Sequence, residues 1–393
     1  MSTTFSRLLL FPFHTLLSTL VALPIIGTAL PLLHWEYWWI RMFDFPRMQL
    51  LIIALAALVA VVFWRGRSLK AKALMAAMLI VTAGYQAYRI YPYTPLAEPQ
   101  VLTTEKDPDD TLDLMVSNVL MDNRNADQLL ALVEQVKPDL LLALEPDKWW
   151  EQQLKPLEKQ YPYTLKAPLD NRYGLLFYSR LELIDPELRY LVKDDIPSIR
   201  TGVRLPSGRE VTVYGVHPEP PSPTEAETSL ERDVELLLVA DEVEKLQGPV
   251  VVMGDLNDVA WSYTTQLFQE TSQLLDPRIG RGMFNSYNAK NPLMRWPLDH
   301  VFIAENFMLV DLERLPSIGS DHFPIHTVLS LKPQADELQK KPERPDADDR
   351  QNIRDKMDKA GKSENIVEGG SDDPEGNTIR DRLEQIKRSA TGD

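Results

Sequence analysis

VVVMGDLN, residues 250–257, sets a short apolar run directly before a carboxylate, Asp255, and an amide, Asn257. Such a run of β-branched residues predicts a buried strand. Catalytic groups of α/β proteins commonly lie at the carboxyl ends of strands, which is where Asp255 and Asn257 would stand. Taken alone, the triplet Asp-Leu-Asn is explained equally well by an Asx-turn.

Further apolar runs predict more strands on both sides of this segment. They cover residues 112–117, 140–144, 174–178, 212–216 and 300–303. Residues 127–136 and 224–246 have the spacing of helices that bury one face. Short buried strands that alternate with helices predict a layered α/β domain.

Polar side chains recur at the ends of these predicted strands. Any one of them is explained more simply as a helix cap or a turn residue. As a set they indicate a catalytic site, because three of the six histidines (His217, His300 and His322) fall in these segments. The other members of the set are Asn118, Glu145, Asp255, Asn257, Asp299 and Asp321.

The order of these segments resembles the endonuclease/exonuclease/phosphatase superfamily, which includes exonuclease III-type nucleases, pancreatic-type deoxyribonuclease, inositol polyphosphate 5-phosphatases and neutral sphingomyelinases. The segments are SNV (117–119), LEP (144–146), GVHP (215–218), GDLN (254–257), LDHVF (298–302) and SDHFP (320–324). The resemblance covers residues 110–331 and implies a four-layer α/β sandwich with two mixed β-sheets. It also implies phosphoester hydrolysis with Mg²⁺ or Mn²⁺.

The resemblance assigns a role to each residue of the set. Asn118, Glu145 and Asp321 are expected to hold the metal, with Glu145 as the principal ligand, and oxygen ligands suit hard cations of this kind. The expected catalytic residues are His217, Asp255, Asn257, Asp299 and His322. Asp255 would orient or deprotonate the water, and Asp299 would orient His322. Arg172, Ser198 and Arg200 are weaker candidates for contact with the substrate.

The N-terminal region predicts a membrane anchor. Three apolar runs occupy residues 8–33, 48–64 and 73–88, and a helix needs about 20 apolar residues to cross a bilayer. We therefore expect a transmembrane region of about three helices over residues 1–92 and a connector over 93–109. Arg65, Arg67, Lys70 and Lys72 make the second loop basic, which favours a cytoplasmic loop. In a bacterial inner membrane, the catalytic domain would then lie on the periplasmic side.

Charge bears on the substrate and on the C-terminus. Residues 101–331 hold 21 basic and 38 acidic groups, a net charge of −17 that opposes binding of a polyanion. A small or membrane-borne phosphoester fits this charge better than a long nucleic acid.

Residues 332–393 are rich in charge and lack aromatic residues, so we expect a disordered tail with at most a transient helix over 378–389.

These observations favour a membrane-anchored, metal-dependent phosphoesterase, with no protein partner indicated. An extracytoplasmic nuclease acting on DNA or RNA is the nearest alternative. A non-catalytic membrane scaffold that keeps the fold is an alternative of another class. The absence of cysteine excludes thiolate metal sites and cysteine nucleophiles.

Overall fold

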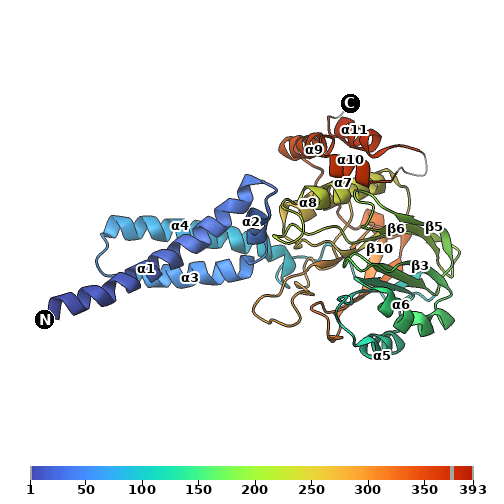
Figure 1. The fold of residues 1–393 in the computed structure, drawn as a ribbon, viewed down its shortest axis with the longest axis horizontal. Coiled ribbons are helices and arrows are strands. Elements are labelled where there is room, and N and C mark those ends of the chain that lie inside the picture. The colour runs from blue at the N-terminus through green and yellow to red at the C-terminus, as the bar shows by residue number, and fades with distance from the viewer. Residues whose placement is uncertain (1, 372–375, 392–393) are drawn as a thin grey trace.

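A computed structural model describes residues 2–371 and 376–391, with side chains from residue 14 onward. Three long helices project from one side of a larger α/β domain (Figure 1). They are α1 (Ser2–Ala29), α3 (Arg47–Phe63) and α4 (Leu69–Ile90), and the short helix α2 (Trp38–Arg41) lies where they meet the domain. Buried small residues such as Ala54 and Ala57 allow these helices to pack closely.

The expected apolar helices are present at the expected positions. Residues 14–33 and 69–93 are each long and apolar enough to cross a membrane. Helix α3 has 17 residues and qualifies only together with residues 38–44, from which it is bent by 74°. Length and composition therefore support two membrane spans, or three if the bent pair is counted as one span.

Two mixed sheets form the centre of the α/β domain. The six-stranded sheet has the order β10-β11-β1-β2-β4-β3, and the five-stranded sheet has the order β5-β6-β7-β8-β9. In chain order the strands are β1 (Thr111–Asn118), β2 (Leu140–Leu144), β3 (Tyr163–Ala167), β4 (Leu175–Ser179), β5 (Leu183–Arg189), β6 (Ser198–Arg204), β7 (Glu210–Val216), β8 (Val250–Asp255), β9 (Asp299–Ile303), β10 (Phe307–Arg314) and β11 (Ile325–Leu331).

Helices cover the outer face of each sheet. One apolar cluster lies between the sheets and joins residues such as Val116 and Leu142 to Val213 and Val251. A second cluster packs α5 (Ala126–Val136) and α6 (Lys148–Leu154) on the six-stranded sheet. A third packs α7 (Leu230–Lys245) and α8 (Tyr263–Ser272) on the other sheet. The four layers confirm the predicted sandwich.

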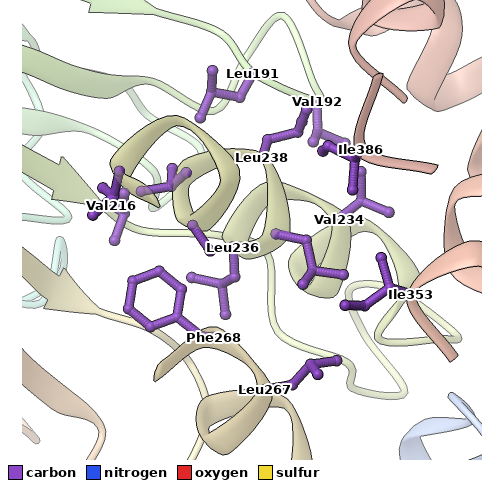
Figure 2. Packing of buried hydrophobic residues seen from close by; sticks show 14 of the residues in the cluster. Leu191, Val192, Val216, Val234, Leu236, Leu238, Leu267, Phe268, Ile353 and Ile386 are labelled. Carbon is purple, nitrogen blue, oxygen red and sulfur yellow. The ribbon is translucent and has the colours of Figure 1, made fainter. Parts of the chain in front are cut away.

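The expectation of a disordered tail is wrong for the described residues. The tail forms α9 (Ala347–Ala360), α10 (Glu364–Gly369) and α11 (Ile379–Ser389), which pack on the outer side of α7 (Figure 2). Buried side chains such as Ile353, Leu383 and Ile386 form this contact. Because α7 lies between a sheet and the tail helices, it is buried on two sides.

Replacing Ile386 by alanine tests this packing. Ile386 is buried against the α7 cluster, so its truncation should cost about 2 to 4 kcal/mol of local stability. Hydrogen exchange of the α9 and α11 amides should then accelerate by roughly 30- to 1000-fold, if these helices open as a unit. The same truncation at the exposed Leu338 should leave that exchange unchanged. Unprotected α9 and α11 amides in the wild-type protein would contradict the packing.

Candidate active site

Sheet register brings the predicted polar residues to one edge of the sandwich. In the parallel pair β1–β2, Asn118 lies opposite Leu144, so Asn118 and Glu145 emerge side by side. In the parallel pair β7–β8, Val216 lies opposite Gly254, which places His217 beside Asp255. The antiparallel pair β8–β9 sets Asp255 opposite Asp299.

Backbone conformation at this edge is unusual. Gly254 has φ of 149°, and a Cβ atom there would lie 1.9 Å from the carbonyl oxygen of Val216, so only glycine fits. Glu145 has a φ of 62°, in the left-handed region that residues other than glycine and asparagine rarely adopt. Asn257 lies in the same region, with a φ of 51°. Strained residues of this kind concentrate at functional sites, where the surrounding structure holds them.

His322 and Asp299 form a close pair. Nδ1 of His322 lies 2.7 Å from Oδ2 of Asp299, and both side chains are buried. Burial lowers the pKa of His322, but the charges of Asp299 and Asp255 outweigh it and raise the pKa to about 10. His322 is therefore a cation at neutral pH.

Asp255 lies at the centre of the site. Its Oδ2 atom is 3.5 Å from Nε2 of His322 and 3.9 Å from Nε2 of His217. The same oxygen accepts a hydrogen bond of 3.2 Å from Nδ2 of Asn118. The other carboxylate oxygen, Oδ1, accepts one of 2.9 Å from the backbone N–H of Asn257. Burial raises the pKa of Asp255 and lowers that of His217, so His217 differs from His322 in being neutral.

Glu145 contributes a carboxylate oxygen without a hydrogen-bond partner to the site. Its Oε1 accepts a hydrogen bond of 2.7 Å from Nδ2 of Asn118, whereas its buried Oε2 has no hydrogen-bond partner among the described residues. An unpaired buried carboxylate oxygen is costly unless it binds a cation. Burial raises the pKa of Glu145 to about 7. These features fit a hard divalent cation.

A second acidic group is less suited to bind a metal. Asp255, Asp299 and His322 lie within ligand distance of one another. However, Nδ1 of His322 is already bonded to Asp299, which leaves only the Nε2 atom of His322 as a ligand. Glu145 is therefore the better anchor, with Asn118 holding it in place.

A cavity of about 300 Å³ opens over these residues. Glu145, His217, Asp255, Asn257, Asp321 and His322 all line it, and so does Arg172. Asn118 and Asp299 lie behind this lining and contact the groups that form it. The sequence therefore predicted most of the polar lining.

Ser198 and Arg200 do not line the cavity, so the expectation that they contact the substrate is corrected. Both belong to β6 in the five-stranded sheet. Ser198 is buried, and its hydroxyl faces the carbonyl oxygen of Arg189 at 3.5 Å. Arg200 donates to the Tyr214 hydroxyl and pairs with Glu187. Both side chains are thus engaged within the sheet.

Aromatic side chains also line the cavity, and of these the sequence did not indicate Tyr287 or Phe45. Tyr173 lies 5.6 Å from the His217 ring and donates a hydrogen bond of 2.8 Å to Glu225. Tyr287 lies 4.9 Å from the His322 ring. Phe45, from the segment between α2 and α3, also lines the cavity. An isolated aromatic residue in a loop carries no pattern that could mark it in advance.

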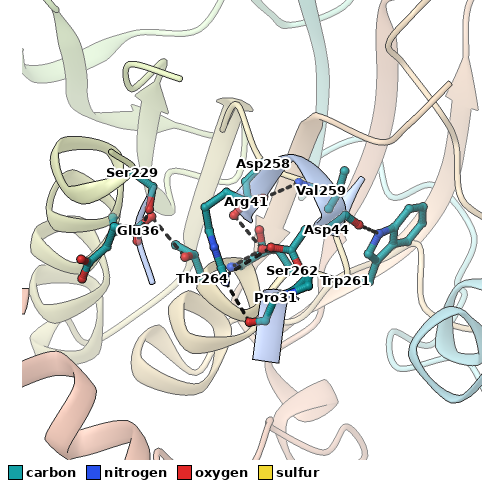
Figure 3. A network of polar contacts seen from close by, with 12 residues as sticks. Pro31, Glu36, Arg41, Asp44, Ser229, Asp258, Val259, Trp261, Ser262 and Thr264 are labelled. Carbon is teal, nitrogen blue, oxygen red and sulfur yellow. Dashed lines mark hydrogen bonds and ion pairs between the residues drawn. The ribbon is translucent and has the colours of Figure 1, made fainter. Parts of the chain in front are cut away.

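The segment between α1 and α3 contacts the loop that follows Asp255 and the start of α7. The Trp261 indole donates a hydrogen bond of 2.8 Å to the carbonyl oxygen of Asp44, and the Ser229 amide donates one of 2.8 Å to that of Glu36 (Figure 3). Within the loop, Ser262 donates to Asp258. The segment between α1 and α3 is thus a support for the catalytic loop.

A buried arginine supports the same loop from α7. Arg232 donates to the carbonyl oxygen of Asn257 at 3.0 Å and pairs with Asp233 and Asp258. Asp233 in turn accepts from Lys356 of α9 at 2.7 Å. The tail helices therefore contribute to the support of the catalytic edge.

Solved structures similar to this chain include the following three. A D. rerio TDP2 complexed with a single-strand DNA product is 17% identical, with 56% of this chain and 100% of that chain covered and a TM-score of 0.47. A functionally unknown conserved protein from Enterococcus faecalis V583 is 16% identical, with 56% and 100% covered and a TM-score of 0.46. The human Nocturnin catalytic domain with bound sulfate is 14% identical, with 58% and 97% covered and a TM-score of 0.45.

No curated protein sequence matches the chain. The assignment rests on the family model for the endonuclease/exonuclease/phosphatase family, which matches residues 115–322, more than half of the 393 residues. This range runs from within β1 to His322 and includes every residue that lines the cavity except Phe45. The chain belongs to the endonuclease/exonuclease/phosphatase family, whose members are metal-dependent phosphoester hydrolases.

Proposed function

We propose that the protein is a membrane-anchored phosphoesterase that uses Mg²⁺ or Mn²⁺ to hydrolyse a phosphodiester or phosphomonoester by attack of water. The observation that carries this proposal is one cavity lined by the cationic His322, the buried Asp255 and Glu145 with its unpaired oxygen. Phosphoester hydrolysis needs a positive field at the phosphate, a positioned water and a proton for the leaving group.

Glu145 would be the principal metal ligand, with Asn118 and Asp321 completing the protein's contribution. When bound, the metal supplies positive charge to the phosphate oxygens and lowers the pKa of a coordinated water. Asn118 links and orients the carboxylates of Glu145 and Asp255, because its amide nitrogen donates to both.

The remaining residues would act on the water and on the phosphate. Asp255 would orient the attacking water and accept its proton. His322, kept protonated by Asp299, would donate to the leaving oxygen or to a phosphate oxygen. Neutral His217 and Asn257 would hold the non-bridging oxygens by hydrogen bonds.

The second part of the proposal is that several helices anchor the protein in a bacterial inner membrane, with the α/β domain on the periplasmic side. The basic loop of residues 65–72 joins α3 to α4 at the ends remote from the α/β domain (Figure 1). A cytoplasmic loop would therefore place the domain on the opposite side of the membrane.

The test uses the full chain in detergent with bis-p-nitrophenyl phosphate, plasmid DNA and RNA. We expect hydrolysis that needs Mg²⁺ or Mn²⁺ and stops on addition of a chelator. The net charge of −17 over residues 101–331 favours the small diester over the two polyanions. Preferred cleavage of DNA or RNA would support the nuclease alternative. A folded protein that binds metal and cleaves none of them would support the scaffold alternative.

Replacing Glu145 by glutamine should weaken metal binding, because the neutral amide keeps the shape of the side chain but removes its charge. We expect the metal concentration for half-maximal activity to rise by about tenfold or more. The matched control is Glu182→Gln, since Glu182 pairs with Arg204 outside the cavity. An unchanged metal requirement in Glu145→Gln would remove Glu145 from the ligand set.

A further inference from the structure

The membrane junction forms part of the cavity wall. Phe45 lines the cavity and lies two residues before α3 begins at Arg47. Its ring meets the edge of Trp296 at 5.5 Å, and Trp296 belongs to the loop that precedes β9. The cavity therefore reaches the level at which an apolar helix of membrane type starts.

The loop of residues 288–296 lies at the same level. Nε2 of Gln49, in the first turn of α3, donates a hydrogen bond of 2.8 Å to the carbonyl oxygen of Leu293. Gln49 follows Phe45 by four residues, and α3 begins between them at Arg47. The loop is thus fixed beside the first turn of α3, on the rim of the cavity that Phe45 and Tyr287 line.

This loop exposes apolar side chains where a soluble rim would be polar. Leu293 is 80% exposed and Met294 is 50% exposed. On α3, one to two turns beyond Gln49, Ile52 and Leu55 are exposed as well. The loop and the helix next to it therefore both expose apolar side chains, as expected of groups that contact the hydrocarbon of a bilayer.

Aromatic side chains indicate the level of the membrane interface independently. Trp35, Tyr37 and Trp39, between α1 and α3, are each about half exposed, and Tyr91 at the end of α4 is too. Exposed tryptophan and tyrosine residues at the ends of apolar helices are typical of the headgroup region. All four lie at the ends of the helices that join the α/β domain, which is also the level of Phe45.

We propose that the substrate is a phosphoester in the headgroup of a membrane lipid, taken from the leaflet in which the anchor ends. The phosphate would enter the cavity toward His322 and Asp255, while the apolar part stays in the bilayer along Phe45, Leu293 and Met294. This inference rests on the proposed phosphoesterase activity and names its substrate class. A substrate already held at the surface does not have to approach through the field of an acidic domain.

The test compares a lipid with a soluble substrate on the same protein. The full chain is reconstituted in vesicles of phosphatidylethanolamine, phosphatidylglycerol and phosphatidic acid with Mg²⁺ or Mn²⁺, and the products are identified by mass spectrometry. The wild-type protein should hydrolyse at least one of these lipids. In the double variant Leu293→Glu, Met294→Glu, lipid hydrolysis should fall at least tenfold, whereas hydrolysis of bis-p-nitrophenyl phosphate should stay within twofold.

Leu338→Glu is the matched control, because Leu338 is an exposed leucine beyond the opposite end of β11 from His322. Leu338→Glu should change neither the rate of lipid hydrolysis nor the rate of bis-p-nitrophenyl phosphate hydrolysis. Hydrolysis of the soluble diester or of DNA without hydrolysis of any of the three lipids would overturn the lipid assignment and leave the phosphoesterase proposal standing. Equal lipid hydrolysis in the double variant and the wild type would overturn the role of the loop. No hydrolysis of any substrate, with metal bound, would instead reject the phosphoesterase proposal.

Discussion

Replacing His322 by glutamine is expected to lower kcat for a soluble phosphodiester by roughly 10²- to 10⁴-fold, the range typical for loss of a positioned acid or base. Glutamine keeps hydrogen-bonding capacity but cannot carry the positive charge that Asp299 maintains on His322. Steady-state kinetics of the full chain in detergent measures the effect. The fall should appear in kcat more than in KM, because the charge acts mainly on the transition state.

His326 provides a matched control for that substitution. It forms a similar pair with Asp113, with Nε2 and Oδ1 2.7 Å apart, between β11 and β1 and outside the cavity lining. His326→Gln should leave kcat within a few-fold of the wild type. If the two histidine variants lose activity to the same extent, His322 has no special catalytic role.

Replacing Arg232 by methionine is expected to lower the free energy of unfolding by about 3 to 5 kcal/mol, because buried carboxylates lose their partner. Arg232 is buried and pairs with Asp233 and Asp258. It also binds the carbonyl oxygen of Asn257, so kcat should fall as well. Chemical denaturation in detergent, followed by tryptophan fluorescence, measures the stability.

The pH dependence of this stability loss distinguishes the loss of ion pairs from a simple loss of packing. Burial alone raises the pKa of Asp233, but Lys356 and Arg232 outweigh it and hold the pKa below 3.8. Without Arg232 the pKa values of Asp233 and Asp258 should rise, so the destabilisation should be full at pH 7 and shrink as the pH falls toward 4. The control Arg204→Met removes an exposed pair with Glu182 and should cost about 1 kcal/mol or less. A loss that does not depend on pH would reject the electrostatic account.

The strands that carry the site could be predicted because they are buried on both faces. All residues of β1, β2 and β8 are buried, and such strands appear in the sequence as continuous apolar runs. Strand β5 was missed because it is half exposed and contains Pro186, which argues against a strand in a sequence-based prediction. Strand β10 lies at the edge of its sheet and exposes most of its second half.

The tail was missed for a different physical reason. Its composition is that of a disordered segment, but Leu383 and Ile386 are three residues apart on α11 and share one buried face. Such a sparse stripe is stable only against another apolar surface, here α7. Among the site residues, Phe45 and Arg232 act through contacts distant in sequence, and no local pattern marks such contacts.

Because of the contacts at their junction, the N-terminal helices cannot be replaced without changing the active site of the α/β domain. The N-terminal helical region supplies Phe45 to the cavity, Asp44 and Glu36 to the contacts that support the catalytic edge, and Gln49 to the rim. Grafting an unrelated transmembrane helix onto residue 100 would restore attachment but not these contacts. Such a chimera is expected to reach the membrane and still lack a complete active site.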